Sequence, residues 1–217
     1  MIPTVLVTGF EPFGGESVNP SADVARALDG RVLAGGAARV VAEVLPCCFG
    51  QAHSALAQAL KRHRPQLVLA LGQAGGRSDF SIERVAINLD DARIADNAGH
   101  QPIDEPVVAG APAAYFSTLP IKAIVAALRD AGLPASVSHS AGTFVCNHVF
   151  FALQHTVADQ PDVRSGFMHL PLLPEQAARH PGQPSLPLQT LITGVAIALE
   201  TGWRVRTDRR ETAGTLA

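Results

Sequence analysis

A run of five apolar residues, Leu67–Leu71, constrains the fold of this chain more than any other feature. A strand without polar alternation is typical of a parallel sheet whose two faces are both covered by helices. Pro65 ends the preceding helical segment, in which Leu56 and Leu60 recur at helical spacing. The sequence therefore predicts a buried central strand in an α/β sheet.

Strand and helix patterns alternate along the rest of the chain. The other expected strands are Thr4–Thr8, Arg39–Leu45, Ser81–Leu89, Ala135–Ser138 and Gly166–Leu170. The expected helices are Pro20–Leu28, Gln51–Arg62, Pro120–Arg129, Val145–Thr156 and Leu186–Thr201, and the Gly- and Pro-punctuated segment Asp90–Pro106 is expected to be a loop bordering a site. This order predicts one domain over residues 1–217, a three-layer α/β/α sandwich with a mostly parallel twisted sheet, as in hydrolases and phosphorylases.

Charge, hydropathy and cysteine content exclude several classes of protein. The net charge is −2 and no block of lysine and arginine occurs, so nucleic acid is not an expected partner. The longest apolar run, Leu191–Leu199, is too short to span a bilayer, and the N-terminus resembles no signal peptide. The three cysteines include no C-x-x-C pair, so neither a disulfide framework nor a zinc site is indicated, and no cofactor is implied. We expect a cytoplasmic protein with a free thiol, and Cys47 and Cys48 packing as small hydrophobic residues.

Cys146 lies where the strand Ala135–Ser138 turns through Gly142 into the helix beginning at Val145. A thiol there is close to the positive end of the helix dipole and to backbone N–H groups that lack intrahelical partners. Such surroundings favour the thiolate and supply donors to a developing oxyanion. This segment predicts a nucleophile, while a buried structural cysteine is the alternative interpretation when the segment is taken alone.

Of the eight histidines, His169 is the best placed to act as a general base. It lies near the end of the apolar strand Gly166–Leu170, and a base must be held on a rigid element. His148, two residues past Cys146, would point to a different face of the helix. A histidine satisfied in the core is the alternative interpretation of His169 alone, and its pairing with Cys146 favours the catalytic interpretation.

Glu83 shares a strand face with two apolar residues, Val85 and Ile87. A carboxylate on such a face is costly unless it meets a hydrogen-bonding partner or a cation. An imidazole that becomes positive during catalysis would satisfy it, and so would a buried ion pair with a neighbouring arginine. Both partners remain open from the sequence.

These segments are similar to the signatures of the pyroglutamyl peptidase I family. Gly72–Gly75 with Ser81–Asn88 resembles its glutamate signature, and Ser138–Asn147 resembles its cysteine signature. Three further segments match other parts of the family: Val7–Ser21, Asp91–Asn97 and Phe167–Gln176. The resemblance runs from about Val5 to about Leu199. One departure is Phe80, where the family usually has an aliphatic residue, and residues 31–38 match nothing diagnostic.

The resemblance implies a cysteine exopeptidase that removes an N-terminal pyroglutamyl residue from peptides through a thioester acyl-enzyme. Carried over by position, Cys146 is the nucleophile, His169 the general base and Glu83 the residue that orients it. The resemblance further implies a homo-oligomer, often a tetramer. From charge and hydropathy, neither nucleic acid nor a membrane is an expected partner.

A pyroglutamyl group is a flat, uncharged lactam, so its site needs an apolar slot and a few hydrogen bonds. The resemblance places Phe10, Phe13, Phe144, Val145 and Gln73 at this slot, although phenylalanines in a loop can equally plug the edge of a domain. Two further candidates are Arg93, which could instead pair with a neighbouring aspartate, and Asn19, which also fits a helix N-cap.

Two alternative functions use the same fold. A nucleoside phosphorylase-like transferase would need a phosphate site, for which the only candidate is the segment Gly72–Arg77, and this segment lacks the Lys-Ser/Thr ending of a P-loop. A binding protein that has lost catalytic activity is the other alternative, and an intact set of cysteine, histidine and glutamate argues against it.

Overall fold

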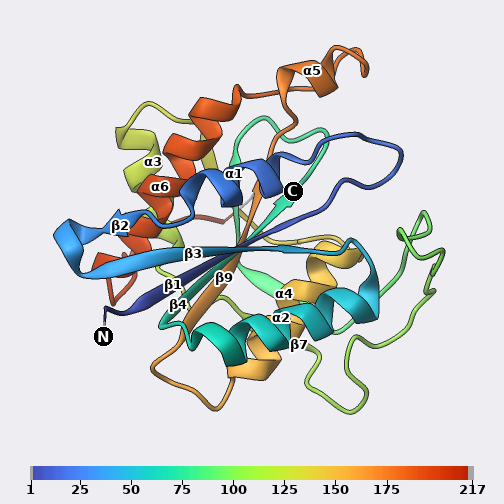
Figure 1. The fold of residues 1–217 in the computed structure, drawn as a ribbon, viewed down its shortest axis with the longest axis horizontal. Helices are drawn as coiled ribbons and strands as arrows, with labels where there is room; N and C mark the ends of the chain where they lie inside the picture. The colour runs from blue at the N-terminus through green and yellow to red at the C-terminus, as the bar shows by residue number, and fades with distance from the viewer. Residues whose placement is uncertain (1, 215–217) are drawn as a thin grey trace.

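The computed structural model describes residues 2–214 and centres on a seven-stranded sheet of order β2-β3-β1-β4-β9-β5-β8, with helices on both faces (Figure 1). The strands of this sheet are β1 (Thr4–Phe10), β2 (Val32–Leu33), β3 (Ala38–Leu45), β4 (Leu67–Gln73), β5 (Phe80–Glu83), β8 (Ala135–Ser138) and β9 (Arg164–Leu170). A separate two-stranded sheet contains β6 (Val85–Ile87) and β7 (Ala114–Phe116). The helices are α1 (Pro20–Leu28), η1 (Ala34–Gly36), α2 (Phe49–His63), α3 (Ile121–Asp130), α4 (Val145–Val157), α5 (Pro174–Ala177) and α6 (Leu188–Arg204).

The sheet is mostly parallel, as the sequence predicts. β1 runs parallel to β3 and β4, β4 to β9, and β5 to β8. The antiparallel pairs are β2 with β3, and β5 with β9. The reversal at β5 has a simple cause: residues 74–79 between β4 and β5 are too few for the crossover that a parallel connection requires.

The two helical layers bury opposite faces of the sheet. Helices α1, α3 and α6 cover one face, and α2 and α4 cover the other (Figure 1). In β4, Leu67, Leu69 and Leu71 belong to the first core, whereas Val68 and Ala70 belong to the second. Both faces of β4 are therefore buried, which confirms the prediction from the run Leu67–Leu71.

The same alternation directs the polar residues at the strand ends toward α4. Leu71, Ile82 and Met168 pack into the core beneath α1, α3 and α6. Successive side chains of a strand point to opposite faces, so the next residue of each strand faces the other layer. Those next residues are Gly72, Glu83 and His169.

One expected strand is divided in the structure. The sequence predicts one continuous strand over Ser81–Leu89, but this segment breaks at Arg84 into β5 of the main sheet and β6 of the small one. The Arg84 N–H donates to the carbonyl of Ser138, the last residue of β8, while Arg84 O accepts from Ser117 N in the segment after β7. The backbone changes partners at this residue, and β7 supplies the second partner strand.

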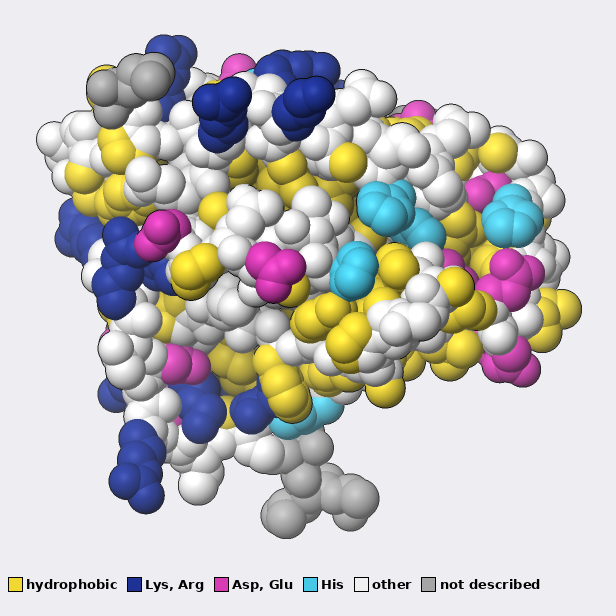
Figure 2. Space-filling view, turned by 90° about the horizontal axis from the view of Figure 1, so that it is seen from below, with side chains coloured by type: hydrophobic (Ala, Val, Ile, Leu, Met, Phe, Trp, Pro, Cys, Tyr) yellow, Lys and Arg dark blue, Asp and Glu magenta, His cyan; other side chains and the backbone are white. Residues whose placement is uncertain are grey.

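The face formed by α2 and α4 is seen in Figure 2, where histidine side chains gather on a largely hydrophobic surface. The rings of His53 in α2 and His148 in α4 have centroids 6.0 Å apart. Burial, followed by the charge of His148, holds the pKa of His53 below its usual value.

Within residues 2–214, no helix has the length and hydropathy needed to cross a membrane.

Candidate active site

Cys146 occupies the helix start that the sequence predicts. α4 begins at Val145 with Phe144 as its N-cap residue, so the N–H of Cys146 lies in the first turn, where no intrahelical acceptor exists. The preceding turn passes through Gly142 with φ of 78°, a conformation that glycine adopts without steric cost. The thiol is therefore presented together with a backbone donor that has no acceptor within the helix. The other two cysteines are buried, which confirms their expected packing role.

Asn147 anchors this helix start to the segment that follows β6. Its side-chain oxygen accepts from Ile87 N at 3.0 Å, and its amide donates to Ile87 O at 2.9 Å and Leu89 O at 3.0 Å. One residue before the helix cap, Thr143 Oγ1 donates to Asp91 O at 2.7 Å. Sequence analysis missed this role of Asn147, although a polar residue inside an apolar helix signals that partners must exist.

Gly72 provides the space that the Cys146 thiol occupies. A Cβ at Gly72 would lie 2.7 Å from Cys146 Sγ and 2.8 Å from the Phe167 ring. In the parallel register of β4 and β9, Gly72 is the partner of His169. The sulfur therefore lies over the backbone of β4, next to the strand that carries the histidine.

Replacing Gly72 by alanine is expected to displace the thiol, because the new methyl group would overlap with the sulfur. A misplacement of the nucleophile by about 1 Å costs on the order of 100-fold in kcat/KM. Overpacking should also lower the free energy of unfolding by about 1–3 kcal/mol. Steady-state kinetics and thermal melting measure both effects. Gly75→Ala is the matched control, because its nearest neighbour would be 3.5 Å away; unchanged kcat/KM in Gly72→Ala would contradict the steric argument.

His169 and Glu83 form a buried pair. His169 Nδ1 lies 2.7 Å from Glu83 Oε1, and the two residues are 3% and 0% exposed. A carboxylate can only accept when ionised, so Nδ1 carries the proton and Nε2 is left with its lone pair. Burial lowers the pKa of His169, while the hydrogen bond to Glu83 opposes this by raising it. Phe167 packs against the imidazole, with ring centroids 4.9 Å apart.

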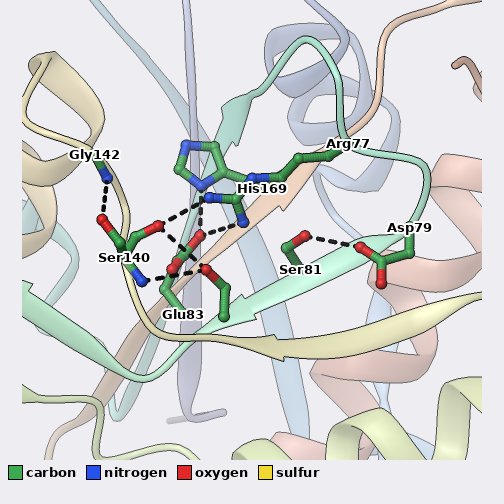
Figure 3. Close-up of polar contacts among 8 residues, drawn as sticks. Arg77, Asp79, Ser81, Glu83, Ser140, Gly142 and His169 are labelled. Atoms are coloured by element: carbon green, nitrogen blue, oxygen red, sulfur yellow. Dashed lines mark hydrogen bonds and ion pairs between the residues drawn. The ribbon is translucent and has the colours of Figure 1, made fainter. Parts of the chain in front are cut away.

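Arg77 is a second partner of Glu83. Its Nη1 donates to Glu83 Oε1 at 2.8 Å and its Nη2 to Ser140 O at 2.9 Å (Figure 3). The sequence left an imidazole and an arginine as alternative partners for Glu83, and the structure contains both. The arginine was missed as a site residue because it comes from the loop before β5 rather than from the strand itself.

The thiol is more strongly held in its neutral form than the sequence predicts. Burial, then the negative charge of Glu83, raises the pKa of Cys146 to about 12, and Arg77 opposes the rise. The expectation of a favoured thiolate at the helix start is therefore wrong for the resting thiol. The sulfur lies over the backbone of Gly72, and the loss of hydration there disfavours the charged form of the thiol.

The predicted aromatic residues form two groups. Phe13 and Phe144 are half-buried and pack together, with ring centroids 5.9 Å apart, and Phe49 meets Phe144 edge-on at 5.4 Å. Phe10 is buried and lies against Phe167 at 6.5 Å. Val145 is also fully buried, so Phe10 and Val145 contribute to the site by packing in the core behind it. Phe49 was not among the predicted residues.

The predicted polar residues differ in how far their hydrogen bonds are already used. Gln73 Oε1 accepts from the buried Gln176 Nε2 at 2.9 Å, which fixes the orientation of its amide. Asn19 caps α1 through its bond from Ser21 N at 3.1 Å and donates to Glu11 O at 3.1 Å, so its amide holds the loop after β1. The N-cap expected from the sequence is confirmed.

Arg93 is exposed and, within the described part of the chain, forms no ion pair. The pairing with an aspartate that the sequence left open is not found. Asp90 instead lies 2.7 Å from His148 Nδ1, and Asp96 accepts from the N–H of Phe49 at 3.0 Å. Arg93 lies two residues after Asp91, whose carbonyl accepts from Thr143 and so joins this loop to the start of α4.

A cysteine at the start of a helix, lying over an α/β sheet beside a buried carboxylate–imidazole pair, is the arrangement of a cysteine-type hydrolase. Comparison with known proteins agrees with this class: the family model described as pyroglutamyl peptidase matches residues 3–205. The chain belongs to the pyroglutamyl peptidase family.

Individual relatives cover nearly all of the chain. It is 60% identical over 217 residues to the pyrrolidone-carboxylate peptidase of Cupriavidus taiwanensis, covering 99% of this chain and 100% of the relative. The crystal structure of pyroglutamyl peptidase I from Bacillus amyloliquefaciens superposes with a TM-score of 0.92 at 44% identity, over 95% of this chain and 100% of that one. A mutant pyrrolidone carboxyl peptidase from Pyrococcus furiosus gives a TM-score of 0.89 at 44% identity, over 92% of this chain and 98% of that one. The three-layer fold predicted from the sequence is therefore confirmed.

Proposed function

We propose that this chain, acting as a single catalytic domain over residues 1–217, hydrolyses the peptide bond after an N-terminal pyroglutamyl residue. Cys146 is the nucleophile, His169 the general base and Glu83 the residue that orients the imidazole. The observation that carries the proposal is the 2.7 Å bond between His169 Nδ1 and Glu83 Oε1, on the sheet face that α4 covers with Cys146.

In the acylation step, Nε2 of His169 removes the thiol proton while Sγ of Cys146 attacks the pyroglutamyl carbonyl carbon. A neutral resting thiol makes this transfer part of the attack, as in a serine hydrolase. The N–H of Cys146 donates to the oxyanion, and one such donor lowers the barrier by about 3 kcal/mol. Nε2 then delivers the proton to the leaving amine as the C–N bond breaks, which gives a thioester. Attack of water, deprotonated by His169, releases pyroglutamate and the free thiol.

Recognition of the lactam uses the aromatic pair and one amide. Phe13 and Phe144 offer half-buried ring faces to a flat group, and Gln73 offers an amide that Gln176 already orients. Phe10 and Val145 act from beneath through packing, and Asn19 acts by holding the loop. Arg93 supplies positive charge near the helix start, in a supporting electrostatic role.

Activity should depend on pH through the imidazole. Because burial holds the pKa of His169 below its usual 6.5, the ring is neutral at neutral pH and able to take the thiol proton. Acid protonates Nε2 and removes the base, so kcat/KM should fall as the pH drops through this lowered pKa. A profile of kcat/KM against pH should show its acid limb below about 6.5. An acid limb clearly above that value would contradict a neutral resting imidazole.

Release of a fluorescent amine from pyroglutamyl-aminomethylcoumarin under reducing conditions tests the proposed activity, with prolyl-aminomethylcoumarin as the control substrate. We expect hydrolysis of the lactam substrate alone and its loss after treatment with iodoacetamide. Failure of a folded protein to hydrolyse it would instead favour the phosphorylase-like transferase or the inactive binding protein. The transferase is disfavoured by Arg77, its candidate phosphate contact, which is already engaged by Glu83 and Ser140.

The proposal extends to assembly and location. The family resemblance favours a homo-oligomer, a tetramer in particular, and the exposed apolar side chains of Phe116 and Ile103, 69% and 71% accessible, are suited to subunit contacts. A cytoplasmic location fits a nucleophilic thiol that must stay reduced.

A further inference from the structure

Arg77 joins two parts of the active site that are distant in the sequence. Its Nη1 bonds to Glu83 on β5, and its Nη2 bonds to the carbonyl of Ser140 in the loop between β8 and α4. That loop is further organised by Ser140 Oγ, which accepts from Gly142 N at 3.2 Å (Figure 3). One guanidinium therefore contacts both the orienting carboxylate and the segment that leads to Cys146.

Glu83 requires such a cation. Its side chain is fully buried, and Oε1 accepts from both His169 and Arg77, whereas Oε2 has no hydrogen-bond partner within residues 2–214. A buried carboxylate that met only a neutral imidazole would be costly, because its charge would be uncompensated. The planar guanidinium of Arg77 supplies that compensation, with one N–H for Glu83 and another for the loop.

We propose that Arg77 is a positioning residue of this active site, which keeps the Glu83 carboxylate charged and fixed beneath His169 and holds the loop leading to Cys146. The inference rests on the proposed function and adds to it a residue that touches none of the reacting atoms. Arg77 acts through Glu83 on the imidazole and through the Ser140 carbonyl on the start of α4.

The charges around the imidazole give this role a measurable signature. Within the described residues, the charged groups that act on His169 are Glu83 from β5 and Arg77 from the loop before β5. Cys146 of α4 lies over the uncharged Gly72, the partner of His169 in the register of β4 and β9. The positive charge of Arg77 lowers the pKa of both His169 and Cys146. Removing that charge should therefore raise both pKa values and move the acid limb of kcat/KM to higher pH.

The first test compares Arg77→Met with Arg77→Lys. Lysine keeps the positive charge but lacks the planar pair of N–H donors that reaches Glu83 and Ser140 together. We expect Arg77→Met to lower kcat/KM by about 10–100-fold, mainly through kcat, as for other residues that orient a functional side chain. Its acid limb should move up by about one pH unit, and Arg77→Lys should restore the limb. Arg62→Met is the matched control, since Arg62 also pairs with a glutamate, at 2.8 Å, but on the exposed surface of α2. An unmoved limb in Arg77→Met would overturn the proposal.

A double-mutant cycle with Glu83→Gln separates a positioning role from a general loss of structure. The amide keeps the shape of Glu83 but carries no charge, so the effect of Arg77→Met should shrink to within about threefold in this background. The same fold loss in both backgrounds would show that Arg77 does not act through Glu83. Thermal melting of each variant identifies any that fail to fold.

Chemical rescue provides a test for a variant with a truncated side chain. Arg77 lines a groove of about 470 Å³ together with serines of β5 and β8 and the loop after β8, so a small cation can reach its place. Guanidinium at non-denaturing concentration should raise the activity of Arg77→Ala several-fold and leave the wild type unchanged. An equal concentration of urea should not. Failure of guanidinium to raise the activity of Arg77→Ala would count against the proposal.

Alkylation of Cys146 by iodoacetamide gives a readout without substrate. At neutral pH the thiol of Arg77→Met should react more slowly than that of the wild type, because its pKa is raised further. If the wild type fails to hydrolyse pyroglutamyl substrate but this difference in alkylation is found, the proposed function fails and the role of Arg77 stands. If hydrolysis occurs and alkylation is unchanged, the role of Arg77 is wrong.

Discussion

Cys146→Ser should lose at least about 10⁴-fold in kcat/KM while keeping its fold, since removal of the nucleophile of a catalytic triad has an effect of this size. Oxygen in place of sulfur fits the space beside Gly72 with no new overlap. A hydroxyl is a far weaker acid than a thiol and its neutral form is a weaker nucleophile, so transfer of its proton to His169 during attack is much less favourable. The melting temperature should therefore stay close to that of the wild type while turnover falls to background.

The other two cysteines provide matched controls for this loss. Cys47 and Cys48 are 3% and 6% exposed, and burial raises the pKa of both thiols. Cys48→Ser should retain wild-type kcat/KM. Normal turnover in Cys146→Ser would contradict the assignment of the nucleophile, and so would inactivation that accompanies alkylation of Cys47 or Cys48 alone.

His169→Ala should lower kcat/KM by about 10³–10⁴-fold, because the thiol of Cys146 is neutral at rest and the substitution removes the imidazole that takes its proton. The residual activity should rise steadily with pH, since hydroxide must then generate the thiolate. The ionic partner of Glu83 is retained, because Arg77 still contacts Oε1. The variant should therefore fold, and circular dichroism together with kinetics across pH checks both expectations.

His139→Ala is the control for this variant, since His139 is exposed and lies in the loop that precedes Cys146. It should keep wild-type rates and the wild-type acid limb. Two results would remove His169 from the mechanism: a His169→Ala variant with an unchanged acid limb, or one with kcat/KM within about tenfold of the wild type.

The parts of this protein that follow simple periodicity could be predicted from the sequence. The run Leu67–Leu71 identifies the central strand because both of its faces are buried, and the order of strands and helices gives the layers. Glu83 and His169 could be predicted because each is a polar residue on an otherwise apolar strand. Such residues need partners, and period two directs both toward the same layer.

Contacts between loops could not be predicted in this way. Arg77 reaches Glu83 and Ser140 from a loop with no periodic pattern, and its long side chain allows many partners. The role of Gly72 depends on the height of the Cys146 sulfur above β4, which only tertiary packing determines. The raised pKa of the thiol has the same origin, because desolvation depends on surroundings that the neighbouring residues do not reveal.

The central claim is that Cys146 forms the acyl-enzyme with His169 as its base. Its most direct test is treatment with pyroglutamyl chloromethyl ketone, followed by peptide mapping by mass spectrometry. We expect one equivalent of label on Cys146, loss of activity in step with labelling, and protection by pyroglutamate. His169→Ala should label far more slowly. Labelling of Cys47 or Cys48 with loss of activity, or activity that survives full labelling of Cys146, would contradict the mechanism.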